Sequence, residues 1–270
     1  MFGRFFGRMK PNVAMYQFPK DQSVLRDLHE KYAASGDLLN LFALNDGPHV
    51  HKWHHYLPLY QQYFAPYRNK PIRFLEIGVS KGGSLRMWRR YFGESAVIYG
   101  IDIDPDCAQH DGADAKVRIG SQDDPAFLNQ VLDEMGGVDV VLDDGSHHMD
   151  HVRASLLTIF PRMTLGGTYM IEDMHTAYWE RFGGGYRSPS NAFQMVREIA
   201  DDVHHWYHRR PHVYPALRDM IGGIHLHDSI VVLDKATVHR PAHSWIGQGS
   251  PYLKPQPSEH EGDASAGERK

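Results

Sequence analysis

The residues Phe74-Leu75-Glu76-Ile77-Gly78-Val79-Ser80-Lys81-Gly82-Gly83-Ser84 lead from an apolar run into a glycine-rich turn, and a helical pattern begins at Ser84. Glycines let a backbone approach a ligand closely, and a helix N-terminus offers unpaired N–H groups. A dinucleotide fold spaces its glycines as G-x-G-x-x-G, whereas this turn reads Glu-x-Gly-x-x-x-Gly-Gly. The spacing therefore favours a methionine-bearing nucleoside over a pyrophosphate. The candidate donor contacts in this stretch are Glu76, Gly78, Ser80, Gly83 and Ser84.

Short β-branched runs alternate with helical stretches from residue 71 to about 236, which is typical of a doubly wound α/β sheet. The last two runs follow one another almost without a turn and favour an antiparallel strand at one sheet edge. The pattern predicts a Rossmann-like class I methyltransferase fold, with a mostly parallel seven-stranded sheet and helices on both faces. The expected strands are Ile72–Ile77, Val97–Ile101, Ala115–Ile119, Val138–Leu142, Gly167–Ile171, Ile224–His227 and Ser229–Leu233.

Three zones follow from the same patterns. Residues 1–70 carry helical periodicity without a convincing strand and are expected to form an N-terminal extension that serves as a lid, a dimer contact or the acceptor side. Residues 71–236 form the predicted S-adenosylmethionine-binding domain. Residues 237–270 are an expected C-terminal tail, largely flexible because the polar end from Pro255 lacks core-forming residues.

Composition excludes several classes of protein. The formal net charge of −4 over 270 residues gives no basic field for nucleic acid or an anionic membrane surface. No apolar run reaches the length of a membrane span, so stable membrane insertion is not expected. The basic and aromatic N-terminus, Met1 to Arg8, lacks the apolar core of a signal peptide, and Cys107 is the single cysteine. A cytoplasmic location is the simplest expectation.

Polar residues after the second and third strands extend the donor site. Asp102 ends Ile98-Tyr99-Gly100-Ile101-Asp102, where such folds bind ribose hydroxyls, although an acidic strand-end cap is an alternative. Ser121 and Gln122 follow the third strand and are candidates for reading the adenine edge. Asp123 fits that role or the N-cap of the next helix.

Carboxylates and imidazoles gather after the fourth and fifth strands. Asp143-Asp144-Gly145-Ser146-His147-His148 follows one strand, and Glu172-Asp173 ends the next. Neighbouring strand ends would bring Asp144 and the Glu172-Asp173 pair together, and a divalent cation would relieve their repulsion. Such an oxygen-rich set suits Mg²⁺ or Mn²⁺ better than zinc. The alternative is that one acid is protonated or paired with arginine.

A nearby histidine would complete the chemistry of that cation. A metal lowers the pKa of a bound hydroxyl, and a base can accept its proton as the oxygen attacks a methyl group. His147, three residues after Asp144, is the candidate catalytic base, and His148 and His175 are its rivals.

Taken in order, these motifs resemble the bacterial metal-dependent sugar O-methyltransferases of the macrocin and mycinamicin type. The resemblance covers about Lys52 to Lys235. Besides the motifs above it includes Lys52-Trp53-His54-His55-Tyr56, Thr176-Ala177-Tyr178-Trp179 and Ile224-His225-Leu226-His227-Asp228-Ser229. It implies Asp144, Glu172 and Asp173 as metal ligands, His147 as general base, and a homodimer. It also implies a donor pocket lined by Tyr56, Glu76, Gly78, Ser84, Asp102, Ser121 and Asp143.

Two departures bear on the acceptor. The glycine loop is compact, and no large auxiliary domain precedes it, so the expected acceptor is a small saccharide rather than a macrolide. Small relatives in the family include an enzyme that methylates a mannoside hydroxyl in polysaccharide biosynthesis, and this resemblance favours a short mannoside or oligosaccharide. The glycine-rich stretch Arg181 to Pro189 fits a mobile lid over a sugar or a plain flexible loop.

Three other functions remain as alternatives. An O-methyltransferase for phenols or other small natural products would use the same donor and metal. A metal-dependent hydroxylase needs two histidines and one carboxylate, usually on a β-rich fold, which the pattern does not favour. A non-catalytic donor-binding scaffold would tolerate loss of His147 or Asp144, and both residues are present.

Overall fold

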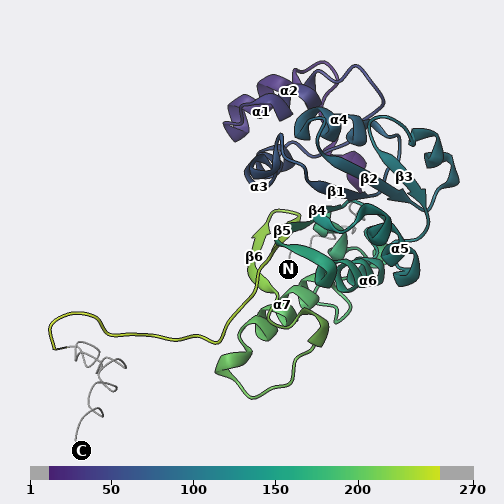
Figure 1. Ribbon diagram of the computed structural model, residues 1–270. Helices are drawn as coiled ribbons and strands as arrows, with labels where there is room; N and C mark the ends of the chain where they lie inside the picture. Colours follow the sequence, from purple (N-terminus) through teal and green to yellow (C-terminus); the bar gives the residue numbers. More distant parts are fainter. Residues whose placement is uncertain (1–11, 250–270) are drawn as a thin grey trace, which may run out of the picture. The chain divides into compact units, whose positions relative to one another are not determined.

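The computed structural model describes residues 12–249 (Figure 1). Residues up to Val238 belong to one compact unit, and the short described part of the second unit, 239–249, contains no helix or strand. The predictions for Met1 to Arg8 and for the polar end from Pro255 lie outside the described residues.

A seven-stranded sheet forms the centre of the first unit, with strand order β3-β2-β1-β4-β5-β7-β6. All pairings from β3 to β5 are parallel, and β7 runs antiparallel to both of its neighbours. This confirms the predicted fold class. The strands are β1 Arg73–Ile77, β2 Val97–Asp102, β3 Lys116–Ile119, β4 Val138–Asp143, β5 Met163–Ile171, β6 Ile221–His227 and β7 Ile230–Lys235.

Helices cover both faces of the sheet (Figure 1). Because successive strand residues point to opposite faces, Leu75 and Ile77 pack into one core and Phe74 into the other. The first core contains α5 Pro125–Met135, α6 Met149–Ile159 and α7 Ala192–Val203. The second contains α1 Val24–Tyr32, α2 Asp37–Ala43, α3 Tyr56–Phe64 and α4 Gly83–Phe92.

Short 3-10 helices connect these elements. They span Val13–Tyr16, Ala65–Tyr67, Pro105–His110, Phe160–Arg162, Met174–Tyr178, Glu180–Phe182, His205–Tyr207 and Pro215–Leu217. None of the helices in the described part of the chain is long and apolar enough to cross a membrane.

The N-terminal helices share a core with the sheet. Tyr60 and Phe64 of α3 lie against Trp88 of α4, with ring centroids 5.4 and 5.5 Å from that indole. Burying such large aromatic rings is a strong stabilising contribution. The domain boundary expected at residue 70 therefore falls inside one compact unit, and the boundary expected at residue 236 lies close to its end at Val238.

Two details of the sheet differ from the sequence-based expectation. The antiparallel strand is β7, one position in from the edge, and β6 forms the edge itself. Strand β5 begins at Met163 rather than Gly167. Both differences concern pairing between segments far apart in the chain, which local hydrophobic patterns do not encode.

Candidate active site

Four parallel strands end together at one edge of the sheet and present most of the expected site residues. The register aligns Ile101, Ile77, Asp143 and Ile171 across β2, β1, β4 and β5. The Gly78 loop, Asp144 and Asp173 therefore leave the sheet side by side. Open α/β sheets bind their ligands at this carboxyl edge.

Asp102 holds the glycine-rich loop in shape. Its Oδ2 accepts hydrogen bonds from the backbone N–H groups of Val79 at 2.8 Å and Ser80 at 3.0 Å. Burial alone would raise the pKa of Asp102, but the amides of Asp104, Ser80 and Val79 hold it below its ordinary value. The carboxylate is thus ionised at the end of β2, where the sequence predicts a ribose contact.

Gly78 and Gly83 are glycines because the protein itself crowds them. A Cβ on Gly78 would lie 2.1 Å from the carbonyl oxygen of Asp144, and one on Gly83 would lie 2.3 Å from that of Pro48. Gly78 also has a φ of +95°, which side-chain-bearing residues avoid. The close approach at these two positions is therefore to neighbouring backbone, a reason that the sequence pattern alone did not supply.

Gly78→Ala is expected to destabilise the protein more than Gly136→Ala. Both glycines have positive φ, but a Cβ on Gly136, at the end of α5, would meet nothing within 4 Å. The control should lose about 1 kcal/mol from left-handed backbone alone, and Gly78→Ala should lose about 1–3 kcal/mol more. Urea unfolding monitored by circular dichroism measures both values. Equal losses would contradict the role of the contact with Asp144.

Glu76 lies under the loop with its side chain fully enclosed. Its Oε2 accepts from Ser84 Oγ at 2.8 Å, and its Oε1 accepts from Trp88 Nε1 at 3.1 Å. Burial raises the pKa of Glu76 to about 7, an effect that Lys52 partly opposes. Glu76 and Ser84 therefore join β1 to α4 and shape the predicted donor pocket from beneath.

Asp143 and Gln122 form a second buried network. Asp143 accepts from Ser155 Oγ at 2.6 Å, Tyr169 OH at 3.1 Å and Gln122 Nε2 at 3.1 Å. The other end of the Gln122 amide accepts from the backbone N–H of Ser146 at 2.7 Å. Burial raises the pKa of Asp143 in spite of these bonds. The network fixes the turn that carries Asp144 and His147.

The structure excludes one of the two roles that the sequence left open for Asp123, namely the N-cap of α5. Asp124 is the N-cap of α5, accepting from the amides of Ala126 and Phe127, so Asp123 does not cap that helix. The hydroxyl of Ser121 donates to the carboxylate of Asp123. Both side chains remain at least partly accessible at the carboxyl edge of the sheet.

Lys52 contacts three acids of the candidate site, although the sequence analysis gave it no role of its own. Its Nζ lies 2.5 Å from Asp144 Oδ2, 3.0 Å from Glu172 Oε2 and 3.8 Å from Glu76 Oε1, and the residue is buried. Burial opposes its charge, but these carboxylates raise the pKa of Lys52 well above its ordinary value. A single lysine in a helical N-terminal zone gives no local signal of such a role.

Asp144, His147 and Asp173 form the candidate cation site within residues 12–249. One ligand atom from each can be chosen so that all three lie within 4.8 Å of one another. The Nε2 of His147 is 3.5 Å from Asp173 Oδ2 and 3.8 Å from Asp144 Oδ1. His147 has a φ of +56°, a left-handed backbone conformation that is uncommon for a residue with a side chain.

Glu172 lies beside this group but faces inward. Its carboxylate accepts from Lys52 Nζ at 3.0 and 3.1 Å and from the hydroxyl of Tyr60. The sequence allowed for an acid paired with arginine; the partner here is a lysine. Glu172 and Asp144 share the same ammonium group, so the third expected acid adjoins the cation site.

The rival histidines differ in their surroundings. His148 is exposed, and its nearest ring neighbours are His151 and Phe182. The Nδ1 of His175 lies 2.6 Å from Ser229 Oγ, and burial lowers its pKa. Of the three, His147 is the one whose ring nitrogen joins the two carboxylates.

Proteins similar in sequence to this chain are methyltransferases. A methyltransferase domain family matches residues 75–174. The chain is 36% identical over 196 residues to the 8-demethyl-8-alpha-L-rhamnosyl tetracenomycin-C 2'-O-methyltransferase of Streptomyces olivaceus, covering 68% of this chain and 51% of that protein. It is 38% identical over 167 residues to the demethylmacrocin O-methyltransferase of Streptomyces fradiae, covering 57% and 42%.

Solved structures agree with these relatives. The MycE methyltransferase from the mycinamycin biosynthetic pathway, in complex with Mg, SAH and mycinamycin VI, superimposes with a TM-score of 0.67 at 33% identity. The match covers 75% of this chain and 54% of that one. The chain carries a methyltransferase domain of the macrocin and mycinamicin type.

The similarity to these methyltransferases confirms the family that the motifs predicted. The chain spans about half the length of the curated relatives, 51% and 54% for two of them. The matched region contains the Gly78 loop, Asp102 and the Asp144 turn, all of which the sequence analysis had selected.

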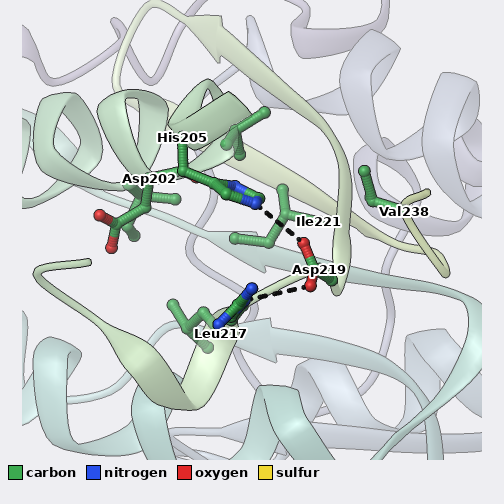
Figure 2. A pocket seen from close by; sticks show the side chains of 9 residues that line it. Asp202, His205, Leu217, Asp219, Ile221 and Val238 are labelled. Atoms are coloured by element: carbon green, nitrogen blue, oxygen red, sulfur yellow. Dashed lines mark hydrogen bonds and ion pairs between the residues drawn. The ribbon is translucent and has the colours of Figure 1, made fainter. Parts of the chain in front are cut away.

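A separate small pocket of the methyltransferase unit lies at the opposite edge of the sheet, beside the start of β6 (Figure 2). In it the Nε2 of His205 is 3.5 Å from Asp219 Oδ1, and neither atom has a hydrogen-bond partner among the described residues. Its volume of about 10 Å³ suits one water molecule. It contains none of the expected site residues and is too small for a nucleoside or a sugar.

Proposed function

We propose that the protein is an S-adenosylmethionine-dependent, divalent-metal-dependent O-methyltransferase that acts on a sugar hydroxyl. The observation that carries the proposal is the convergence of Asp144, His147 and Asp173 beside the Gly78 loop. The relatives described above are O-methyltransferases that act on an α-L-rhamnosyl tetracenomycin and on demethylmacrocin.

The donor is proposed to lie along the carboxyl edge between β1, β2 and β3. Asp102 is ionised there for the ribose hydroxyls, and Ser121 lies at the turn proposed to meet the adenine. The buried members of the predicted set act by shaping the pocket. The proposed set is Glu76, Gly78, Ser80, Gly83, Ser84, Asp102, Ser121, Gln122 and Asp143; the hydroxyl of Tyr56, which the family resemblance also placed in the donor pocket, donates instead to Asp173.

The cation site fits a hard divalent ion. Its donor set is rich in carboxylate oxygen, the ligand that Mg²⁺ and Mn²⁺ prefer. Asp144 and Asp173 would hold the ion, with the neighbouring Glu172 as the third carboxylate. Bound there, the metal supplies a Lewis acid that lowers the pKa of a sugar hydroxyl.

His147 is proposed to accept the proton of that hydroxyl. Its Nε2 faces the same point as the free oxygens of Asp144 and Asp173, so it lies within reach of a hydroxyl placed there. The donor sulfur is already positively charged, so the remaining task of the chain is to align the methyl group with the acceptor oxygen.

The acceptor is proposed to be a short mannoside or oligosaccharide, in a pathway of polysaccharide biosynthesis. Aromatic rings lie close to the histidines of the site. The ring centroid of Trp179 is 4.9 Å from that of His175, and the ring centroid of Phe182 is 6.3 Å from that of His147. Such rings stack on sugar C–H faces and equally on phenols, so a phenolic acceptor is the alternative. The homodimer and the cytoplasmic location stay predictions.

Calorimetric titration with S-adenosylhomocysteine, with and without Mg²⁺, tests the class. We expect saturable binding, and methyl transfer that is abolished by EDTA and restored by Mg²⁺ or Mn²⁺. A screen over methyl mannosides, short oligosaccharides and catechols then names the acceptor class. Binding without turnover on any acceptor would favour a donor-binding scaffold, and absence of binding would overturn the donor site.

A further inference from the structure

The segment from Lys52 to Tyr60 binds one oxygen of Asp144, one oxygen of Asp173 and both oxygens of the neighbouring Glu172. Tyr56 OH donates to Asp173 Oδ1 at 2.7 Å, and Lys52 Nζ donates to Asp144 Oδ2 at 2.5 Å. Tyr60 OH donates in the same way to Glu172. Three donors from one short segment thus meet three acids from two strand ends.

The second oxygens of Asp144 and Asp173 both lie near the ring of His147. Asp144 Oδ1 is 3.8 Å and Asp173 Oδ2 is 3.5 Å from His147 Nε2. A carboxylate whose one oxygen is fixed by a hydrogen bond can rotate little, so the direction of the other oxygen is fixed too. The donors therefore decide which oxygens converge.

The donors are themselves held rigidly. Tyr56 and Tyr60 have no exposed surface, and they lie four residues apart on α3, so both rings project from one face of the helix. Their ring centroids are 6.2 Å apart in an edge-to-face arrangement. The hydroxyl of Tyr56 points at Asp173, which lies on the cation side of the site and not on the Asp102 side.

We propose that Tyr56 is a positioning residue for the divalent cation, acting through Asp173, and that Tyr60 and Lys52 do the same for Glu172 and Asp144. This assigns Tyr56 to the metal and not to the donor pocket that the family resemblance implied. The proposal rests on the proposed function only in that a divalent cation binds at these acids. Outer-shell partners of this kind typically change metal affinity by about 10- to 100-fold.

The test uses Tyr56→Phe, which removes only the hydroxyl, and two separate titrations of the full chain. Mn²⁺ binding is measured by electron paramagnetic resonance, and S-adenosylhomocysteine binding by calorimetry in EDTA. We expect the Kd for Mn²⁺ to rise about 10-fold or more, while the Kd for S-adenosylhomocysteine changes less than about twofold. Tyr60→Phe should also weaken Mn²⁺ binding without changing nucleoside binding.

Tyr63→Phe is the matched control on the same helix. Its hydroxyl lies 2.8 Å from His227 Nε2 and contacts none of the three acids, so both affinities should stay within about twofold. Unchanged Mn²⁺ affinity in Tyr56→Phe would overturn the positioning proposal alone, and weakened nucleoside binding would restore Tyr56 to the donor pocket. Absence of Mn²⁺ binding in the unmodified protein would instead overturn the proposed cation site, and this inference with it.

Discussion

His147→Ala should lower kcat by about 100- to 10,000-fold while leaving the affinity for S-adenosylhomocysteine within about twofold. The imidazole is the proposed proton acceptor, and its Nε2 faces both Asp144 and Asp173. Because proton transfer occurs only as the acceptor oxygen attacks, kcat and kcat/KM should fall together. Steady-state methyl transfer and calorimetry with the same preparations provide both quantities.

His148→Ala is the neighbouring control. His148 is exposed and lies outside the group formed with Asp144 and Asp173, so its loss should change kcat less than about threefold. Activity of His147→Ala within about tenfold of the unmodified enzyme would exclude His147 as the base. A large loss in His175→Ala would then move the assignment to that residue.

Lys52→Met should reduce the free energy of unfolding by about 3–5 kcal/mol, enough to unfold a marginally stable domain. The substitution keeps much of the side chain's length but removes the ammonium group that Asp144, Glu172 and Glu76 share. Buried carboxylates without a counter-charge are then left inside the protein. Urea unfolding followed by fluorescence measures the difference, and Lys31→Met serves as the control.

Lys31 is exposed and pairs with Asp27, one turn earlier on α1. The buried carboxylate of Asp27 keeps a second partner in His54 when Lys31 is replaced, so the loss should be about 0–1 kcal/mol. A loss below about 1 kcal/mol in Lys52→Met, equal to that in Lys31→Met, would show that the buried acids do not depend on Lys52.

The loss in Lys52→Met should also grow as the pH rises through about 7. Burial already raises the pKa of Glu76 to about 7 from an ordinary value of 4.5, and Lys52 lowers it. Between these values the folded state binds more protons than the unfolded state, so stability falls with rising pH. Without Lys52 the pKa of Glu76 in the folded state rises further. The pH range over which stability falls with rising pH then extends to higher pH. A loss that is constant from about pH 5 to pH 8 would contradict this account.

Much of the fold follows from local pattern. The alternation of apolar runs with helical stretches predicted the parallel strands β1 to β5, because a buried parallel strand needs apolar residues on both faces. The position of β7 between β5 and the edge strand β6 was not predicted. Pairing direction depends on where the chain returns after α7, and no short window of sequence contains that information.

The candidate site divides in the same way. The sequence by itself determined the glycine loop, Asp102, Asp144, His147 and Asp173, because each follows a strand and all parallel strands end at one sheet edge. Only the tertiary structure decided which partners those acids have. Lys52 reaches Asp144 across 92 residues and Glu172 across 120, and Tyr56 reaches Asp173 across 117. A buried charge without a partner is costly, so each buried acid needs a nearby donor. Folding brings these donors to the acids from distant parts of the chain, and the spacing of residues along the sequence does not predict such pairs.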